Sequence, residues 1–135
     1  MTPLFLDTGF LIALESSDDQ HHQAAHRFWR TYLNDPTKLI TTSFIIDEAE
    51  TFFNARGHHA KALEIGNYLM TSKTIQLIYI TEEQFVEGWH WLERHQDKRY
   101  SLTDCISFVV MKQLKVKAAL TFDKHFAQAG LQMMP

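Results

Sequence analysis

The chain has 135 residues, 45% of them hydrophobic, so we expect one compact domain with its own core and no second domain. Thirteen Lys and Arg against sixteen Asp and Glu give a formal net charge of −3, which excludes a globally basic nucleic-acid binder. The single cysteine, Cys105, excludes an intramolecular disulfide, and no apolar run approaches the roughly 18 residues of a membrane span, so a soluble, cytoplasmic protein is expected.

Short apolar runs alternate with segments of helical periodicity along the whole chain. In chain order we predict a strand over 3–6, helices over 9–16 and 22–33, a strand over 38–42, helices over 44–56 and 59–71, a strand over 75–80, helices over 82–95 and 102–114, and a strand over 118–122. Capping-box patterns begin two of these helices, at Thr81 with Gln84 and at Ser101 with Asp104. The alternation predicts an α/β fold with a parallel sheet covered by helices on both faces.

Four acidic residues occupy positions that solubility alone does not explain. Asp7 and Asp123 directly follow predicted strands, so they belong to the carboxyl edge of the sheet, where open α/β sheets place their sites. Asp104 lies in the first turn of a predicted helix, where the helix dipole favours a carboxylate. Glu48 stands on or beside the apolar stripe of its helix, where a charge is costly unless a cation pairs with it, and no Lys or Arg has the spacing to do so.

Taken singly, each acid also has a structural interpretation. Asp7 can cap the first helix, Asp104 can be half of a capping box, Asp123 can cap a short turn, and Glu48 can sit at the rim of its stripe. Taken together, several carboxylates without a cysteine set predict one or two Mg²⁺ or Mn²⁺ ions. Such a site is typical of phosphodiester hydrolysis.

Four segments of the sequence resemble the signature blocks of the PIN-domain family. They are Phe5-Leu6-Asp7-Thr8, Thr42-Ser43-Phe44-Ile45-Ile46-Asp47-Glu48, Ser101-Leu102-Thr103-Asp104 and Leu120-Thr121-Phe122-Asp123-Lys124-His125-Phe126. They occur in order over essentially the whole chain, and within the family they look most like the VapC-type ribonuclease toxins of prokaryotic toxin–antitoxin pairs.

The resemblance implies a single PIN-like domain over residues 1–135, a three-layer α/β/α sandwich with a mainly parallel sheet, and a Mg²⁺- or Mn²⁺-dependent endoribonuclease. It implies that the catalytic metal ligands are Asp7, Glu48, Asp104 and Asp123, and that Thr8, Ser101 and Thr121 orient a carboxylate or a water. It also implies two protein partners: a second copy in a homodimer and a small cognate antitoxin.

An RNA substrate needs local positive charge on this acidic chain. The basic residues nearest the acids in sequence are Arg94, Lys98, Arg99 and Lys124, and we take Arg99 and Lys124 as candidate phosphate contacts. The eight histidines form no HExxH pattern with a third ligand, so we assign them no catalytic role.

Other functions fit parts of the sequence. A PIN-like domain can act in RNA processing or as a non-catalytic RNA-binding scaffold. The string Asp7-Thr8-Gly9 matches an aspartic protease acting as a homodimer, which predicts an all-β protein, and acids at strand ends also occur in phosphate-accepting receiver modules.

Overall fold

Five strands form a single, entirely parallel sheet at the centre of the fold. The computed structural model describes residues 2–135, and its strands are β1 (Leu4–Leu6), β2 (Leu39–Thr42), β3 (Ile75–Ile78), β4 (Ala118–Leu120) and β5 (Gln132–Met134). Their order across the sheet is β3-β2-β1-β4-β5, and every neighbouring pair is parallel. The predicted parallel sheet is therefore confirmed.

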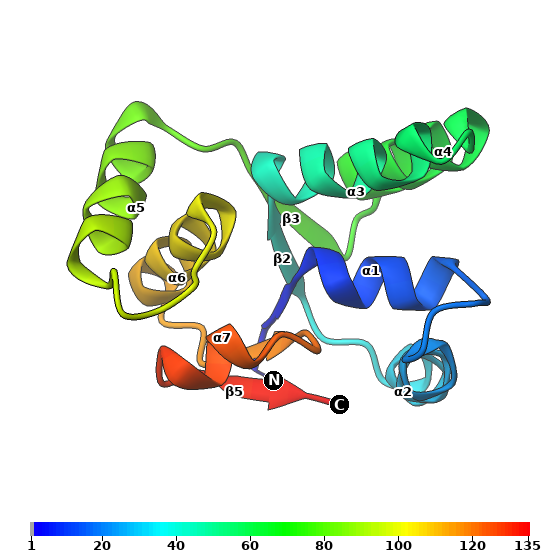
Figure 1. The fold of residues 1–135 in the computed structure, drawn as a ribbon. Helices are drawn as coiled ribbons and strands as arrows, with labels where there is room; N and C mark the ends of the chain where they lie inside the picture. Colours follow the sequence, from blue (N-terminus) through cyan, green and yellow to red (C-terminus); the bar gives the residue numbers. More distant parts are fainter. Residues whose placement is uncertain (1) are drawn as a thin grey trace.

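Helices cover both faces of this sheet. They are α1 (Thr8–Glu15), α2 (His22–Asn34), α3 (Ser43–Ala55), α4 (His59–Thr71), α5 (Glu82–Arg94), α6 (Leu102–Leu114) and α7 (Lys124–Gln128). Figure 1 shows α5 and α6 on one side of the sheet and α1, α2 and α4 on the other. This is the predicted three-layer α/β/α arrangement. Among residues 2–135, no helix combines the length and the apolarity that a membrane crossing requires.

The predicted elements are present, with small shifts at their ends. The helix predicted over 59–71 and the one predicted over 102–114 have the predicted bounds, and both capping boxes form. The strand predicted over 118–122 ends earlier, at Leu120, so Asp123 does not directly follow a strand. Helix α7 and strand β5 were not predicted, because five and three residues are too short to carry a periodic pattern.

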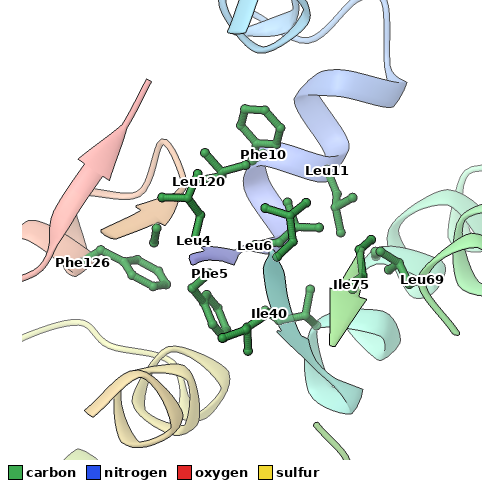
Figure 2. Close-up of a cluster of buried hydrophobic side chains, with 14 of the residues drawn as sticks. Leu4, Phe5, Leu6, Phe10, Leu11, Ile40, Leu69, Ile75, Leu120 and Phe126 are labelled. Atoms are coloured by element: carbon green, nitrogen blue, oxygen red, sulfur yellow. The ribbon is translucent and has the colours of Figure 1, made fainter. Parts of the chain in front are cut away.

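The two faces of β1 bury alternate side chains in two halves of the core (Figure 2). Phe5 is fully buried and packs against Phe126 of α7, with ring centroids 6.3 Å apart. Leu6 points to the opposite face, where it lines a cavity together with Leu11 of α1 and Ile75 of β3. Because both faces are covered, the strand is apolar throughout instead of alternating with polar residues.

The strand order reverses between β1 and β4. Strands β2 and β3 lie on one side of β1, and β4 and β5 lie on the other. The connections that leave the carboxyl ends of these two adjacent strands therefore run in opposite directions, and this is where open α/β sheets bind their ligands. Asp7 follows β1 here, and Thr121 follows β4.

Candidate active site

Asp7 is a buried carboxylate that turns away from the helix it precedes. It occupies the residue before α1, but its side chain makes no capping hydrogen bond there. Instead the hydroxyl of Thr121 donates to Asp7 Oδ2 over 2.7 Å. Asp7 is only 5% exposed, and this burial, opposed by the hydrogen bond from Thr121 and reinforced by the negative charges of Asp104 and Asp123, raises the pKa of Asp7 to about 7.

Glu48 reaches the same region from α3. This helix begins directly after β2, and the Thr42 hydroxyl caps it by accepting the N–H of Ile45 over 3.2 Å. Glu48 is half-buried, and the hydroxyl of Thr8 donates to its Oε1 over 2.6 Å. Burial raises the pKa of Glu48, and the negative charge of Asp104 raises it further, against the opposing effect of the Thr8 hydrogen bond.

Asp104 lies in the first turn of α6, held by a reciprocal pair of bonds with Ser101. Asp104 N–H donates to Ser101 Oγ over 3.0 Å, and Ser101 N–H donates to Asp104 Oδ2 over 3.1 Å. The structural interpretation of Asp104 as half of a capping box is thus confirmed. The residue is also 9% exposed and close to other acids: burial raises its pKa, and the charge of Asp123 adds to the rise. One carboxylate therefore both caps a helix and faces the acidic cluster.

Asp123 caps the unpredicted helix α7. Its Oδ1 accepts the backbone N–H of His125 over 2.9 Å, and its own N–H donates to Thr121 Oγ1 over 3.0 Å. The hydroxyl of Thr121 thereby connects Asp7 with the backbone of Asp123. The turn-cap interpretation of Asp123 is correct, and the same turn brings the acid to the edge of the sheet beside Asp104.

The structure brings all four acids to one place, from four different segments. Thr121 joins Asp7 to the backbone of Asp123, and Thr8, the residue after Asp7, donates to Glu48. His125 Nδ1 lies within 3.2 Å of an oxygen of both Asp104 and Asp123. The four acids also raise one another's pKa, since the charge of Asp104 acts on Asp7 and Glu48 and that of Asp123 on Asp7 and Asp104. No lysine or arginine forms an ion pair with any of them among residues 2–135. Clustered carboxylates without such a counter-charge fit a divalent cation, for which carboxylate oxygen is a preferred ligand.

His125 belongs to this cluster, although the sequence patterns assigned it no role. Its Nδ1 lies 3.1 Å from Asp104 Oδ2 and 3.2 Å from Asp123 Oδ1. One ligand atom from each of these three residues lies within 4.8 Å of the other two, which is compatible with a shared ion. The sequence feature that could have indicated His125 is its position two residues after Asp123. Both residues lie at the start of α7, which has only five residues and is too short to carry an HExxH motif.

The two candidate phosphate contacts lie on the surface near these acids in sequence. Arg99 is exposed between α5 and α6, two residues before Ser101. Lys124 is exposed as the first residue of α7, next to Asp123. Neither side chain forms an ion pair within residues 2–135, so both charges are free to meet a polyanion.

Comparison with known proteins decides the family. The family model described as the PIN domain matches residues 4–131. The chain belongs to the PIN-domain family. It is 31% identical over 127 residues to the 23S rRNA-specific endonuclease VapC20 of Mycobacterium tuberculosis, a match that covers 94% of each protein. The resemblance that the four sequence blocks indicated is therefore confirmed.

Solved structures agree with this PIN-domain assignment. The crystal structure of VapC20 of Mycobacterium tuberculosis, titled a sarcin-ricin loop cleaving toxin, superposes with a TM-score of 0.88 at 29% identity and covers 98% of this chain and 99% of that one. FitAcB from Neisseria gonorrhoeae shares the fold at 13% identity, with a TM-score of 0.67 and coverage of 98% and 96%. A toxin–antitoxin complex from Klebsiella pneumoniae does so at 13% identity, with a TM-score of 0.62 and coverage of 90% and 87%.

The observed fold contradicts two of the alternative functions. An aspartic protease requires an all-β protein, whereas Asp7-Thr8-Gly9 here joins a parallel strand to helix α1. A receiver module has the strand order 2-1-3-4-5, and this sheet has the order β3-β2-β1-β4-β5. Both interpretations are therefore wrong.

Proposed function

We propose that this chain is a divalent-metal-dependent endoribonuclease that acts as the toxin of a toxin–antitoxin pair. The observation that carries the proposal is the convergence of Asp7, Glu48, Asp104 and Asp123 at the edge of the sheet. They converge in a PIN-domain chain that is similar over 94% of its length to an rRNA-specific endonuclease. That similarity makes ribosomal RNA the substrate class we favour.

The four carboxylates would hold one or two Mg²⁺ or Mn²⁺ ions. When bound, such an ion supplies Lewis acidity that makes a water molecule nucleophilic and stabilises the leaving oxygen of the phosphodiester. Because burial raises the pKa of Asp7 to about 7, part of the molecules hold this proton at neutral pH, and metal binding must displace it from them. Burial of Asp7 and Asp104 keeps their charges from being screened by solvent, which strengthens their attraction for a cation.

Three hydroxyl-bearing residues would fix the orientation of these ligands. Thr8 donates to Glu48, Thr121 donates to Asp7, and Ser101 exchanges hydrogen bonds with Asp104. The bonds from Thr8, from Thr121 and from the Ser101 N–H each use one lone pair of a carboxylate and leave the others available, whereas the Ser101 hydroxyl accepts the Asp104 N–H. Partners of this kind set the geometry of metal ligands, so their removal should weaken metal binding without removing a ligand.

Arg99 and Lys124 would contact RNA phosphates beside the site. If they do, replacing both with alanine should reduce the slope of log affinity against log salt by about 1.4 to 1.8, because two fewer phosphate contacts release fewer counterions on binding. The matched control is Arg30→Ala with Lys38→Ala, which removes the same charge from exposed positions on α2 and just before β2. A slope that falls equally in both double variants would reject specific contacts at Arg99 and Lys124.

A cognate antitoxin and a second copy of the chain are the partners we propose. The likeness to VapC20 supports an antitoxin, because that protein is described as a toxin. The exposed apolar side chains of Phe85, Val86 and Trp89 on α5 offer a surface for contact between copies. Sedimentation of the purified protein should then give twice the mass of 15.8 kDa. A Trp89→Lys variant should give the monomer mass; a wild-type monomer at high concentration would reject the dimer.

The direct test is cleavage of total cellular RNA by the purified protein with Mn²⁺ or Mg²⁺, compared with the same reaction in EDTA. Cleavage should require the metal, and Asp104→Asn should reduce its rate by at least about a hundredfold. Asp97→Asn makes the same charge change at an exposed residue and serves as the control. Metal binding without cleavage of any RNA, including intact ribosomes, would instead favour the scaffold alternative.

A further inference from the structure

His125 is placed as a ligand would be, not as a surface histidine. Its Nδ1 faces two carboxylates at once, Asp104 Oδ2 at 3.1 Å and Asp123 Oδ1 at 3.2 Å. A neutral or charged imidazole has at most one proton on this nitrogen, so it can make only one well-directed hydrogen bond to the pair. Nδ1 is within hydrogen-bonding distance of Asp104 Oδ2, and the same nitrogen with one oxygen of each carboxylate forms a group of three ligand atoms within 4.8 Å of one another, which a shared cation would fit.

The imidazole is held in this position from two directions. The ring of Tyr100 packs against it edge to face, with centroids 5.4 Å apart and an interplanar angle of 88°. The backbone N–H of His125 donates to Asp123 Oδ1 over 2.9 Å, so this bond joins the histidine and the acid at the start of α7. Tyr100 is itself buried, with 7% of its surface exposed, so the His125 ring packs against a side chain of the core. Packing against Tyr100 and the contact of Nδ1 with Asp104 Oδ2 together hold the ring in this position.

We propose that His125 is a nitrogen ligand of the metal site, through Nδ1, together with Asp104 and Asp123. The inference rests on the proposed function, since it adds a ligand to the same site. As a ligand, Nδ1 would present its lone pair, and the ring proton would be on Nε2. The inference adds an imidazole to a set that otherwise consists of carboxylates.

An imidazole ligand changes which ion the site selects. Mg²⁺ prefers oxygen ligands almost exclusively, whereas transition-metal ions accept imidazole nitrogen readily. A site with three or four carboxylates alone would hold Mg²⁺ and Mn²⁺ by similar chemistry. With His125 as a ligand, we expect the site to prefer Mn²⁺ over Mg²⁺, and this preference should depend on the imidazole.

A different role for His125 would leave other traces. If the ring only keeps the two carboxylates in position, it is a positioning residue that never touches the metal. Its loss would then weaken binding of Mg²⁺ and Mn²⁺ by the same factor, and no nitrogen would be coordinated to a bound ion. The two roles are separated by spectroscopy of the bound ion and by comparison of the two metals.

The experiment measures Mn²⁺ bound to the purified full chain, by electron spin echo envelope modulation and by titration. We expect the wild-type protein to show the ¹⁴N modulation of a coordinated imidazole and His125→Gln to lack it. We also expect His125→Gln to lower Mn²⁺ affinity about tenfold or more. Its Mg²⁺ affinity should change by less than about threefold. His90→Gln, which replaces an exposed histidine on α5 whose ring contacts Glu93, should retain the wild-type signal and affinities.

Each result decides one way. Bound Mn²⁺ without nitrogen modulation, or equal losses of Mg²⁺ and Mn²⁺ affinity in His125→Gln, would overturn the ligand role while leaving the proposed nuclease intact, provided that the wild-type protein cleaves RNA with metal. Failure of the wild-type protein to bind either metal would overturn both proposals. Circular dichroism of His125→Gln should match the wild type. If it does not, His125→Asn supplies the same test with a smaller side chain.

Discussion

Replacing Asp7 with asparagine should make the metal-free protein more stable while removing its metal site. Asp7 lies at the end of β1, is 5% exposed, and is bordered by the negative charges of Asp104 and Asp123. Asparagine has nearly the same shape and can still accept the hydrogen bond from Thr121 through its amide oxygen. The substitution therefore removes a buried charge with little change in packing.

The magnitude follows from the shift in the pKa of Asp7. Burial first, and then the neighbouring acids, raise it from 3.8 to about 7 in the folded protein. Each pKa unit corresponds to about 1.4 kcal/mol, so ionised Asp7 costs at most about 4 kcal/mol. The new amide N–H₂ has no established partner, which offsets part of the gain. We expect the variant to be more stable than the wild type by about 1 to 3 kcal/mol at pH 8 in EDTA.

The pH dependence has a definite sign. Below pH 4 Asp7 is protonated in both the folded and the unfolded chain, so its ionisation has no effect on stability. Between pH 4 and pH 7 the unfolded chain loses this proton while the folded chain keeps it, so the wild-type protein becomes less stable as pH rises. The advantage of Asp7→Asn should therefore grow across this range and then level off.

The assay is urea denaturation of both proteins in EDTA at pH 4.5 and pH 8. Asp47→Asn is the control, because Asp47 is exposed on α3 and its substitution removes the same charge. It should change the free energy of unfolding by less than about 0.5 kcal/mol. Excess Mn²⁺ should reverse the order of wild type and Asp7→Asn, since only the wild type would gain binding energy. An Asp7→Asn variant that is less stable than wild type at pH 8 in EDTA would refute the reasoning.

Three further predictions concern the site and its support. Mn²⁺ affinity of the wild-type protein should rise between pH 5.5 and pH 7.5, because burial raises the pKa of Asp7 to about 7 and binding must displace its proton; calorimetric titration giving equal affinities would contradict this. Thr121→Val removes a hydroxyl that has two hydrogen-bond partners, so it should lower the free energy of unfolding by about 1 to 3 kcal/mol and also weaken Mn²⁺ binding. Thr121→Ser keeps the hydroxyl and should retain both properties. Gly88→Ala would place a Cβ 2.6 Å from Ile106 Cγ1, so thermal denaturation should show a loss of stability of about 1 to 3 kcal/mol from the α5–α6 contact. Gly66→Ala is the control: its added Cβ would have no atom within 4 Å, so the variant should be as stable as the wild type or more stable.

Local patterns were sufficient to predict most of the fold. The predicted bounds of helix α6 match the observed ones because Ser101 with Asp104 marks the start of the helix. Glu48 was singled out because apolar residues surround it at helical spacing, and the structure places it half-buried against Thr8. Asp7 was singled out because it ends an apolar strand.

Contacts between distant segments were beyond these patterns. The hydrogen bond from Thr121 to Asp7 joins residues 114 positions apart, and the His125–Asp104 contact spans 21 positions between α6 and α7. The five residues of α7 are too few to show a helical period, so the sequence pattern predicts a strand that continues to residue 122 and gives no role to His125. A contact between side chains of two different elements depends on how those elements pack, so it can be identified only from the three-dimensional structure.

Single-turnover cleavage of ribosomal RNA by Glu48→Gln and by Asp47→Asn tests the central claim most directly. The two acids are adjacent on α3, but only Glu48 joins the cluster, through Thr8 and the charge of Asp104. With saturating Mn²⁺, Glu48→Gln should cleave at least about a hundredfold more slowly than the wild type, and Asp47→Asn should cleave at the wild-type rate. Equal rates for the two variants would mean that the convergent acids are not the catalytic site.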